Sequence, residues 1–332
     1  MRRIVCIGFT ATLFLTLGLC SHGFAATFKA MVSQAMHSLG VSKNDPTLLV
    51  LTNATFVKEN GTNALKWLDQ AQEQSGCTVG KGNLLFFQRP QNHPLRLMLF
   101  KKKDGHAIIF SRENNKWESD DLNIGPDAIS RADFWMEAGS YHAGKDLFSL
   151  AAVANVWAKG GPYDFLKCAE LHNHICPKLT SGYLMAHYIL DHFPLKSGER
   201  YTVVACPVWC KEDAFQVVMD CTPGKRGLIV KKLSDDQKKQ IRIDHPAGMV
   251  LVWDAKQKRG RGAALSFSFD PLRALSPEGT PKAAMVLSAL DYLDKPDKFV
   301  STAAEFDLDE KRYDAIVQAG NNPWEVVGLS RN

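Results

Sequence analysis

The sequence predicts an α+β fold in two related halves. Segments with helical hydrophobic spacing and short apolar runs of strand length both occur along the chain. A cysteine–threonine turn with glycines occurs in each half, at residues 76–82 and 220–227, each time between a predicted helix and a predicted strand. The 332 residues, 45% hydrophobic and 23% charged, suffice for two domains of ordinary size.

The first half combines two predicted helices with short predicted strands. Helices are predicted at residues 28–40 and 64–74, and strands at residues 48–52, 84–88, 95–100 and 106–111. An Asp-Gly pair at residues 104–105 favours a tight turn, so the last two strands should pair as a hairpin. Residues 113–144 are polar and weakly patterned but include several aromatic residues, which predicts a structured connection.

The second half has the same mixture of elements. Helices are predicted at residues 147–159, 177–193, 211–219, 281–294 and 310–319, and strands at residues 202–205, 228–230, 249–253 and 263–269. Pro177 suits the first position of its helix, because its missing N–H would be unpaired there. Gly182 permits the close approach of a neighbouring segment, and Trp324 is expected to cover an edge.

The N-terminus has the features of a signal peptide. A basic pair precedes an apolar run at residues 4–19, and small residues end at Ala25, which predicts cleavage after that position. Cys20 admits a lipoprotein alternative, although Leu19 before it is bulkier than lipid-modifying processing prefers. No other stretch approaches the length of a membrane span. We therefore predict a signal peptide over residues 1–25 and an exported protein, periplasmic or secreted, with no stable membrane span.

Residues 26–145 and 146–332 are the two predicted halves of the mature chain. The formal net charge of +5 includes two arginines of the predicted leader. Lysines and arginines are otherwise scattered, and the short basic groups at residues 101–103 and 256–261 are typical of solvated loops. No nucleic-acid-binding module is recognisable, so nucleic acid is not an expected partner.

Six cysteines remain after removal of the predicted leader. They are Cys77, Cys168, Cys176, Cys206, Cys210 and Cys221. Five of them fall between residues 168 and 221, interleaved with His172 and His174, whereas a disulfide-stapled scaffold would spread its cysteines more evenly. We therefore favour metal ligation by part of this cluster. Disulfides are the alternative in an oxidising compartment, with Cys168 and Cys206 as the expected pair.

His172, His174 and Cys176 occupy alternate positions directly before the predicted helix at residues 177–193. In an extended segment this alternation would point all three side chains to the same side. The positive end of the helix dipole favours a thiolate at the helix start. Imidazole and thiolate together suit zinc, and could also bind iron, nickel or copper. The stretch therefore predicts a transition-metal site.

A second group of candidates surrounds the predicted helix at residues 211–219. The spacing of Cys206 and Cys210 is not CxxC and no histidine follows, so a covalent c-type haem is not indicated. Cys210 stands three residues before Asp213 at the helix start, where its sulfur could bind the same metal. Asp213 is expected to cap the helix, or alternatively to act as a base.

These motifs resemble a known family. The run Leu-His-Asn-His-Ile-Cys-Pro at residues 171–177, with Gly-Tyr at 182–183, resembles the Phe-His-Gly-His-x-Cys-Pro-Gly…Gly-Tyr signature of the FmdE family, which takes its name from formylmethanofuran dehydrogenase. Residues 210–225 resemble its Cys-x-x-Asp-Ala-x-Gln…Gly-Cys-Thr-x-Gly-Lys block. The resemblance covers roughly residues 165–270, and residues 76–83 look like a second, degenerate copy of the Cys-Thr-x-Gly-Lys block.

The resemblance implies an α+β domain with a mixed β-sheet and a transition-metal site, usually taken to bind zinc. Carried over residue by residue, the implied metal ligands are His172, His174, Cys176, Cys210 and Cys221. Some residues depart from the family pattern: Asn173, Lys178 and Asp220 replace glycines, and Arg226-Gly227 replaces Gly-Asn. Only the second half carries the His-rich stretch at residues 172–176 and the extra cysteines, so one metal site is expected.

Two functions remain open from the sequence. The chain could be a metal-binding accessory or metal-handling module, serving a redox-enzyme partner. Alternatively, it could be a metal-dependent enzyme with a small-molecule ligand at an open coordination position. A closed four-ligand site favours the first, and three ligands beside a pocket favour the second. An exported protein is not expected to act on methanofuran, a cytoplasmic coenzyme. The oligomeric state stays open, a dimer included.

Overall fold

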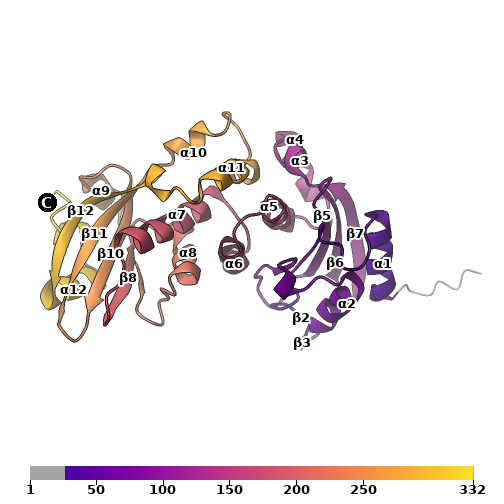
Figure 1. The fold of residues 1–332 in the computed structure, drawn as a ribbon, viewed down its shortest axis with the longest axis horizontal. Coiled ribbons are helices and arrows are strands. Elements are labelled where there is room, and N and C mark those ends of the chain that lie inside the picture. Colours follow the sequence, from indigo (N-terminus) through magenta and orange to yellow (C-terminus); the bar gives the residue numbers. More distant parts are fainter. Residues whose placement is uncertain (1–26, 332) are drawn as a thin grey trace, which may run out of the picture.

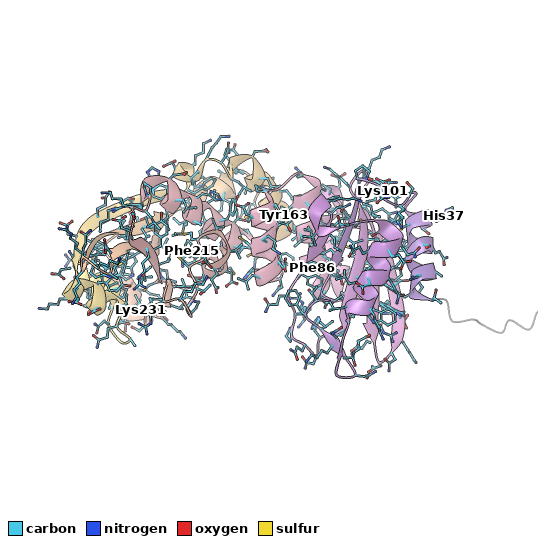
Figure 2. All side chains as sticks on the ribbon, turned by 60° about the horizontal axis from the view of Figure 1, so that its bottom comes forward. His37, Phe86, Lys101, Tyr163, Phe215 and Lys231 are labelled. Carbon is cyan, nitrogen blue, oxygen red and sulfur yellow. The ribbon has the colours of Figure 1, made fainter. Side chains whose placement is uncertain are left out.

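The computed structural model describes residues 27–331, and the predicted signal peptide lies outside them. The fold is α+β, as predicted, with one five-stranded mixed sheet in each half of the chain. Figure 1 shows the two sheets at opposite ends of the molecule, with helices α5 (Asp146–Ala158) and α6 (Tyr163–His172) between them. Tyr163, at the start of α6, accordingly lies between Phe86 of the first sheet and Phe215 of the second half (Figure 2).

The first half contains one sheet in the order β4-β1-β5-β6-β7. Its strands are β1 (Leu48–Thr52), β4 (Leu84–Phe86), β5 (Leu95–Lys101), β6 (His106–Glu113) and β7 (Lys116–Asn123), and a separate small hairpin is formed by β2 (Lys58–Glu59) and β3 (Thr62–Asn63). Its helices are α1 (Phe28–Ser38), α2 (Leu65–Ser75), α3 (Pro126–Ile129) and α4 (Ala132–Glu137). The predicted hairpin of residues 95–111 is confirmed as β5 and β6.

The second half contains the sheet β12-β11-β10-β8-β9. Its strands are β8 (Glu199–Ala205), β9 (Leu228–Val230), β10 (Pro246–Asp254), β11 (Arg259–Phe267) and β12 (Val300–Asp309). Its helices after α6 are α7 (Pro177–His192), α8 (Lys211–Val218), α9 (Asp235–Gln240), α10 (Asp270–Ala274), α11 (Lys282–Ala289), α12 (Glu310–Val317) and α13 (Pro323–Val326).

The two sheets share one strand arrangement. In each, a parallel pair, β1 with β4 or β8 with β9, is extended by three antiparallel strands on the other side of the first strand. Val50 of β1 pairs with Leu84 and Leu99, and Val203 of β8 pairs in the same way with Leu228 and Val250. The two halves therefore have the same topology.

One hydrophobic core joins the two halves. Alternate residues of a strand face opposite sides of a sheet, so Leu49 of β1 and Val203 of β8 belong to a shared core with α5, α6, α7 and α8, whereas Val50 packs against α1 and α2. Val204 faces the opposite side, where Trp324 is fully buried. The expectation that Trp324 covers an edge is thus replaced by a core position.

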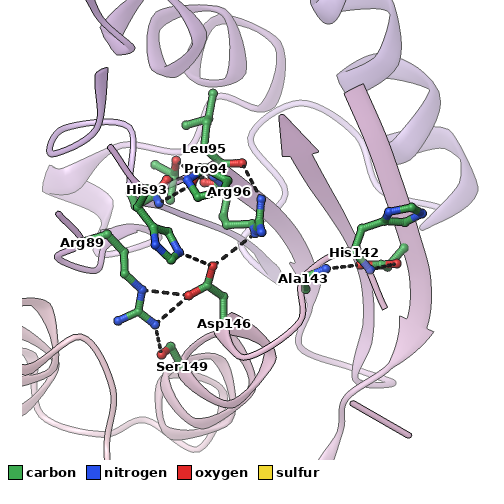
Figure 3. A network of polar contacts seen from close by, with 12 residues as sticks. Arg89, His93, Pro94, Leu95, Arg96, His142, Ala143, Asp146 and Ser149 are labelled. Carbon is green, nitrogen blue, oxygen red and sulfur yellow. Dashed lines mark hydrogen bonds and ion pairs between the residues drawn. The ribbon is translucent and has the colours of Figure 1, made fainter. Parts of the chain in front are cut away.

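A buried ionic network adds to the joint between the halves (Figure 3). The Asp146 carboxylate, at the start of α5, is 2.8 Å from Arg89 Nε, 2.8 Å from His93 Nε2 and 3.2 Å from Arg96 Nε. Asp146 is 3% exposed. Because a buried carboxylate is stable only when paired, these contacts hold α5 against the loop and strand of the first half.

Several elements differ from the sequence prediction or were not predicted. Residues 113–144 were expected to be a connection, but they contain the edge strand β7, whose side chains are mostly exposed and polar and so lack an apolar pattern. The helix α6 and the edge strand β12, which alternates buried and exposed side chains only in part, were not predicted. Within residues 27–331 no helix has the length and apolar character needed to cross a bilayer, in agreement with the expectation of no stable membrane span.

Candidate metal centre

His172 was expected in an extended segment. It is instead the last residue of α6. Asn173 ends the helix in the left-handed conformation, with φ of 66°. Asparagine tolerates this conformation better than most residues other than glycine. The chain therefore reverses within a few residues, and it is this turn, rather than strand alternation, that brings His172 back towards Cys176.

Cys176 is the N-cap of α7. Its sulfur accepts a hydrogen bond from the backbone N–H of Leu179 at 3.4 Å, and Pro177 occupies the first helical position, as predicted. The open N-terminal turn offers unpaired N–H groups and the positive end of the helix dipole. The hydrogen bond from Leu179 acts to lower the pKa of the Cys176 thiol, but contact with Cys210 and burial outweigh it.

Cys210 reaches the same place from the start of α8. Helices α7 and α8 touch at Gly182, where an added Cβ would lie 2.4 Å from the backbone oxygen of Lys211. Only glycine permits this approach, as the sequence suggested. The close crossing sets Cys210 beside Cys176.

Three of the predicted ligands come together. The ligand atoms of His172, Cys176 and Cys210 all lie within 4.8 Å of one another. Cys176 is buried and the other two side chains are half-buried. One imidazole nitrogen and two sulfurs at this spacing form a donor set that suits zinc and other borderline transition metals.

His172 is held in the orientation that a metal ligand requires. Its Nδ1 is 2.7 Å from Oδ2 of Asp213, and its buried Nε2 has no hydrogen-bond partner. A buried imidazole nitrogen without a partner is costly, and a metal ion would satisfy it. Carboxylate contacts of this kind orient metal-ligating histidines in general. Asp213 thus acts on His172 in addition to its place in the first turn of α8.

The charges of the three groups are linked. The neighbouring Cys176 thiol and His172 imidazole lower the pKa of the Cys210 thiol, whereas the neighbouring Cys210 sulfur and burial raise the pKa of Cys176. Burial alone would lower the pKa of His172, but the Asp213 carboxylate and the Cys210 sulfur raise it to about 9. Without a metal, the site therefore favours a thiolate on Cys210 beside an imidazolium.

His174 lies next to this group without belonging to it. Its ring centroid is 4.4 Å from that of His172 and 5.3 Å from the ring of Phe148, and its Nδ1 is 2.9 Å from Oδ1 of Asn173. Burial and the neighbouring charge of His172 lower the pKa of His174 to about 4. His174 is therefore a neutral imidazole beside the three ligand atoms.

Cys221 is buried in the turn before β9 and is not one of the three grouped ligands. It occupies the position that Cys77 has in the first half, where the sulfur donates to the carbonyl of Leu48 at 3.5 Å. In both turns a threonine side chain accepts from the backbone N–H three residues later, at Lys81 and Lys225. The structure therefore surrounds Cys221 with turn and core contacts.

The alternative disulfide between Cys168 and Cys206 is not formed in the structure. All six cysteines within residues 27–331 are free thiols. Cys168 of α6 belongs to the core between the sheets, whereas Cys206, at the end of β8, faces the opposite side of its sheet. The sheet itself separates the two sulfurs, and linear sequence could not reveal on which face each would lie.

A cavity of about 700 Å³ adjoins the cluster. Cys176, Cys210 and His174 contribute to its wall, together with side chains from α5, α7, α10 and α11 and from the residue before α10: Phe148, Pro177, Lys178, Phe269, Leu272, Arg273, Lys282 and Met285. The volume is typical of a small-molecule site. Sequence reasoning missed the residues from α5, α10 and α11, because no motif links those segments to the histidines.

Lys211 was also missed as a supporting residue. It is fully buried beside Cys210, and its Nζ donates to Glu212 and to the carbonyl of Pro207 and lies 3.7 Å from the ring centre of Trp209. Its unusual feature, burial of a lysine, cannot be seen in a sequence. The contacts fix the loop that carries Cys210.

Comparison with known families finds a match over the part of the chain that carries this site. Residues 171–282 match the FmdE family. The family is described as "FmdE, Molybdenum formylmethanofuran dehydrogenase operon". The matched FmdE segment runs from the residue before His172 to the start of α11, and so contains the three grouped ligands and most of the cavity wall. It leaves out the first half of the chain, and no curated protein matches the chain.

Proposed function

We propose that this chain binds a transition-metal ion, zinc by its donor set, through His172, Cys176 and Cys210, and that it is a metal-dependent enzyme. The observation that carries the proposal is the convergence of three ligand atoms within 4.8 Å at the wall of a large cavity. Catalytic zinc sites use three protein ligands and keep one position open, whereas structural sites use four.

A metal held in this way supplies Lewis acidity, which polarises a carbonyl oxygen or activates water. The surrounding residues would serve the reaction in separate ways. Asp213 orients His172 through its 2.7 Å contact. His174 contributes to the cavity wall, and its low pKa keeps the imidazole neutral beside a bound ligand.

An accessory or metal-handling role, with a redox-enzyme partner, is the second candidate. It is favoured by the position of His174, whose ring centroid lies 4.4 Å from that of His172. If His174 turned a ring nitrogen towards the metal, it would add a fourth ligand and close the coordination shell. A closed shell cannot take a substrate.

We further propose that residues 146–332 form the metal-binding FmdE-like domain, and that residues 26–145 are a degenerate copy of the same unit. The support is the shared strand order of the two sheets and their matching register. The first copy has no counterpart of the His-rich stretch at residues 172–176, and its only cysteine is Cys77. Residues 1–25 would act as a signal peptide, which places the mature protein in the periplasm or outside the cell.

The test of an open coordination position is substitution with cobalt(II). The visible spectrum of the cobalt form should show thiolate-to-metal charge transfer and tetrahedral bands that weaken in the variants His172→Ala and Cys210→Ser. Addition of azide should shift the bands, because an open position admits a small anion. A cobalt spectrum that azide leaves unchanged would favour the closed, accessory site.

A further inference from the structure

The cavity beside the metal centre has two chemically different parts. Phe148, Phe269, Leu272 and Met285 give it an apolar wall, and Leu272 is 1% exposed. Its charged wall residues are three cations, Lys178, Arg273 and Lys282, all of them exposed. No residue that lines the cavity carries a carboxylate. The apolar wall residues are thus buried or half-buried, and the three exposed cations mark the mouth of the cavity.

These cations come from separate elements and are largely unneutralised. Arg273 of α10 forms an ion pair with Asp270 at 2.8 Å. Among residues 27–331, no carboxylate forms an ion pair with Lys178 of α7 or Lys282 of α11. Like charges gathered at one opening repel each other unless an anion lies between them, and they attract anions from solution.

We propose that the cavity binds a small organic anion with an apolar body, whose charged group lies between Lys178, Arg273 and Lys282 at the mouth. Its apolar part lies against Phe148, Phe269 and Met285, and points towards Cys176, Cys210 and His174. The inference rests on the proposed function, because the apolar end of the ligand is the end that would lie next to the metal. It names the ligand class of that site.

The arrangement has a consequence for specificity. A ligand without the negative charge should bind more weakly, because the three cations at the mouth would still repel one another. Removing the apolar body should cost more affinity, because Phe148 and Phe269 would remain in contact with water. Lys178 stands where the FmdE pattern has glycine, so this cation of the mouth departs from that pattern.

The test is calorimetric titration of the full chain with 2-naphthoate, its neutral analogue 2-naphthamide and acetate. Each ligand is titrated into zinc-loaded and metal-free protein, and the zinc content of every sample is measured. The variant is Lys282→Gln, and the matched control is Lys232→Gln, an exposed lysine that does not line the cavity.

We expect 2-naphthoate to bind, and 2-naphthamide and acetate each to bind at least about tenfold more weakly. The amide lacks the negative charge, and acetate lacks the apolar ring system. Lys282→Gln should weaken 2-naphthoate by about three- to tenfold, and Lys232→Gln should leave the affinity unchanged. Both variants should keep the zinc content of the wild type.

Three results would overturn the inference: no binding of 2-naphthoate, equal binding of the amide, or no effect of Lys282→Gln. If metal removal abolishes binding while Lys282→Gln has no effect, the carboxylate binds the metal and not the mouth, which also overturns it. If the protein holds no zinc but still shows the charge preference and the Lys282 effect, the proposed metal function fails and the ligand class stands.

Discussion

At the residue scale, the contact between Asp213 and His172 is the most informative feature of the site. It fixes Nδ1 as the nitrogen bound to a carboxylate and leaves Nε2, buried and without a partner, as the ligand atom. Such supporting contacts commonly contribute about 10- to 100-fold to metal affinity. Asp213 thus matters although it is not itself one of the grouped ligands.

Asp213→Ala should therefore weaken zinc binding by about 10- to 100-fold, with little change in the fold because the side chain is half-buried. The measurement is competition with a zinc chelator of known affinity. Asp191→Ala, at an exposed and unpaired position on α7, is the control and should bind zinc like the wild type. Equal zinc affinity in Asp213→Ala and Asp191→Ala would show that Asp213 does not support the metal site.

Residues that replace family glycines lie at unusual backbone angles. Asn173, Asp220 and Arg226 have φ of 66°, 55° and 57°, and two of these positions correspond to Gly76 and Gly82 in the first half, with φ of 70° and 69°. The glycines of the family pattern are thus explained by the left-handed conformation. Asparagine and aspartate tolerate it better than arginine does.

Arg226→Gly should stabilise the protein by about 0.5–1 kcal/mol, since relief of left-handed strain outweighs the greater flexibility of glycine in the unfolded chain. Arg226 is exposed, so little packing is lost. Chemical denaturation measures the free energy of unfolding. Arg242→Gly, at an exposed position without positive φ, should instead destabilise. A loss of stability in Arg226→Gly would refute this interpretation.

At the scale of elements, the crossing of α7 and α8 sets the site. Cys176 begins α7 and Cys210 begins α8, so their sulfurs keep their spacing only while the helices touch at Gly182. An added methyl group at that point must push the helices apart. The metal site therefore depends on a residue that contacts no metal.

Gly182→Ala should lower the free energy of unfolding by about 1–3 kcal/mol, as overpacking does, and should also weaken zinc binding. Thermal unfolding and chelator competition on the same samples give both effects. Gly139→Ala, where a Cβ meets no atom within 4 Å, is the matched control and should change neither. Normal zinc affinity in a destabilised Gly182→Ala protein would show that the metal site does not depend on the close crossing of α7 and α8.

The sequence predicted most of the elements that have strong local signals. The pair Asp104-Gly105 correctly predicted the β5–β6 hairpin, and Pro177 correctly predicted the start of α7. The polar strand β7 gave no such signal, because an edge strand with exposed side chains needs no apolar alternation. The extended conformation expected around His172 was wrong, because His172 ends a helix, and alternate residues do not point to the same side at a helix end as they do in a strand.

The site was predicted in part for the same reason. His172, Cys176 and Cys210 belong to recognisable motifs, and the structure brings them together. The cavity depends on Phe148, Lys282 and Met285, which are distant in sequence and are gathered by tertiary packing alone. Nothing local in the chain marks them.

At the scale of the whole molecule, the two halves act as one unit. The core between the sheets is continuous through α5 and α6, and the carboxylate of Asp146 joins α5 to Arg89 and Arg96 of the first half. The first half also packs against the metal-binding half through α6, where the backbone N–H of Gln88 donates to Glu170 at 2.9 Å. We therefore expect cooperative unfolding.

Asp146→Asn should destabilise the protein by about 3–5 kcal/mol, because the change leaves buried cations without their counter-charge. Denaturant unfolding, followed by tryptophan fluorescence and by circular dichroism, should show one transition in the wild type and an earlier one in the variant. Asp69→Asn, an exposed position on α2, is the control. Two separate transitions in the wild type would show that the halves fold independently.

The most direct test of the central claim is the metal content of the purified full-length protein, measured by elemental mass spectrometry. The account predicts about one equivalent of a transition metal per chain, lost in Cys176→Ser, Cys210→Ser and His172→Ala and kept in Cys77→Ala, the cysteine of the first half. A wild type without stoichiometric metal, or cluster variants that keep it in full, would contradict the account.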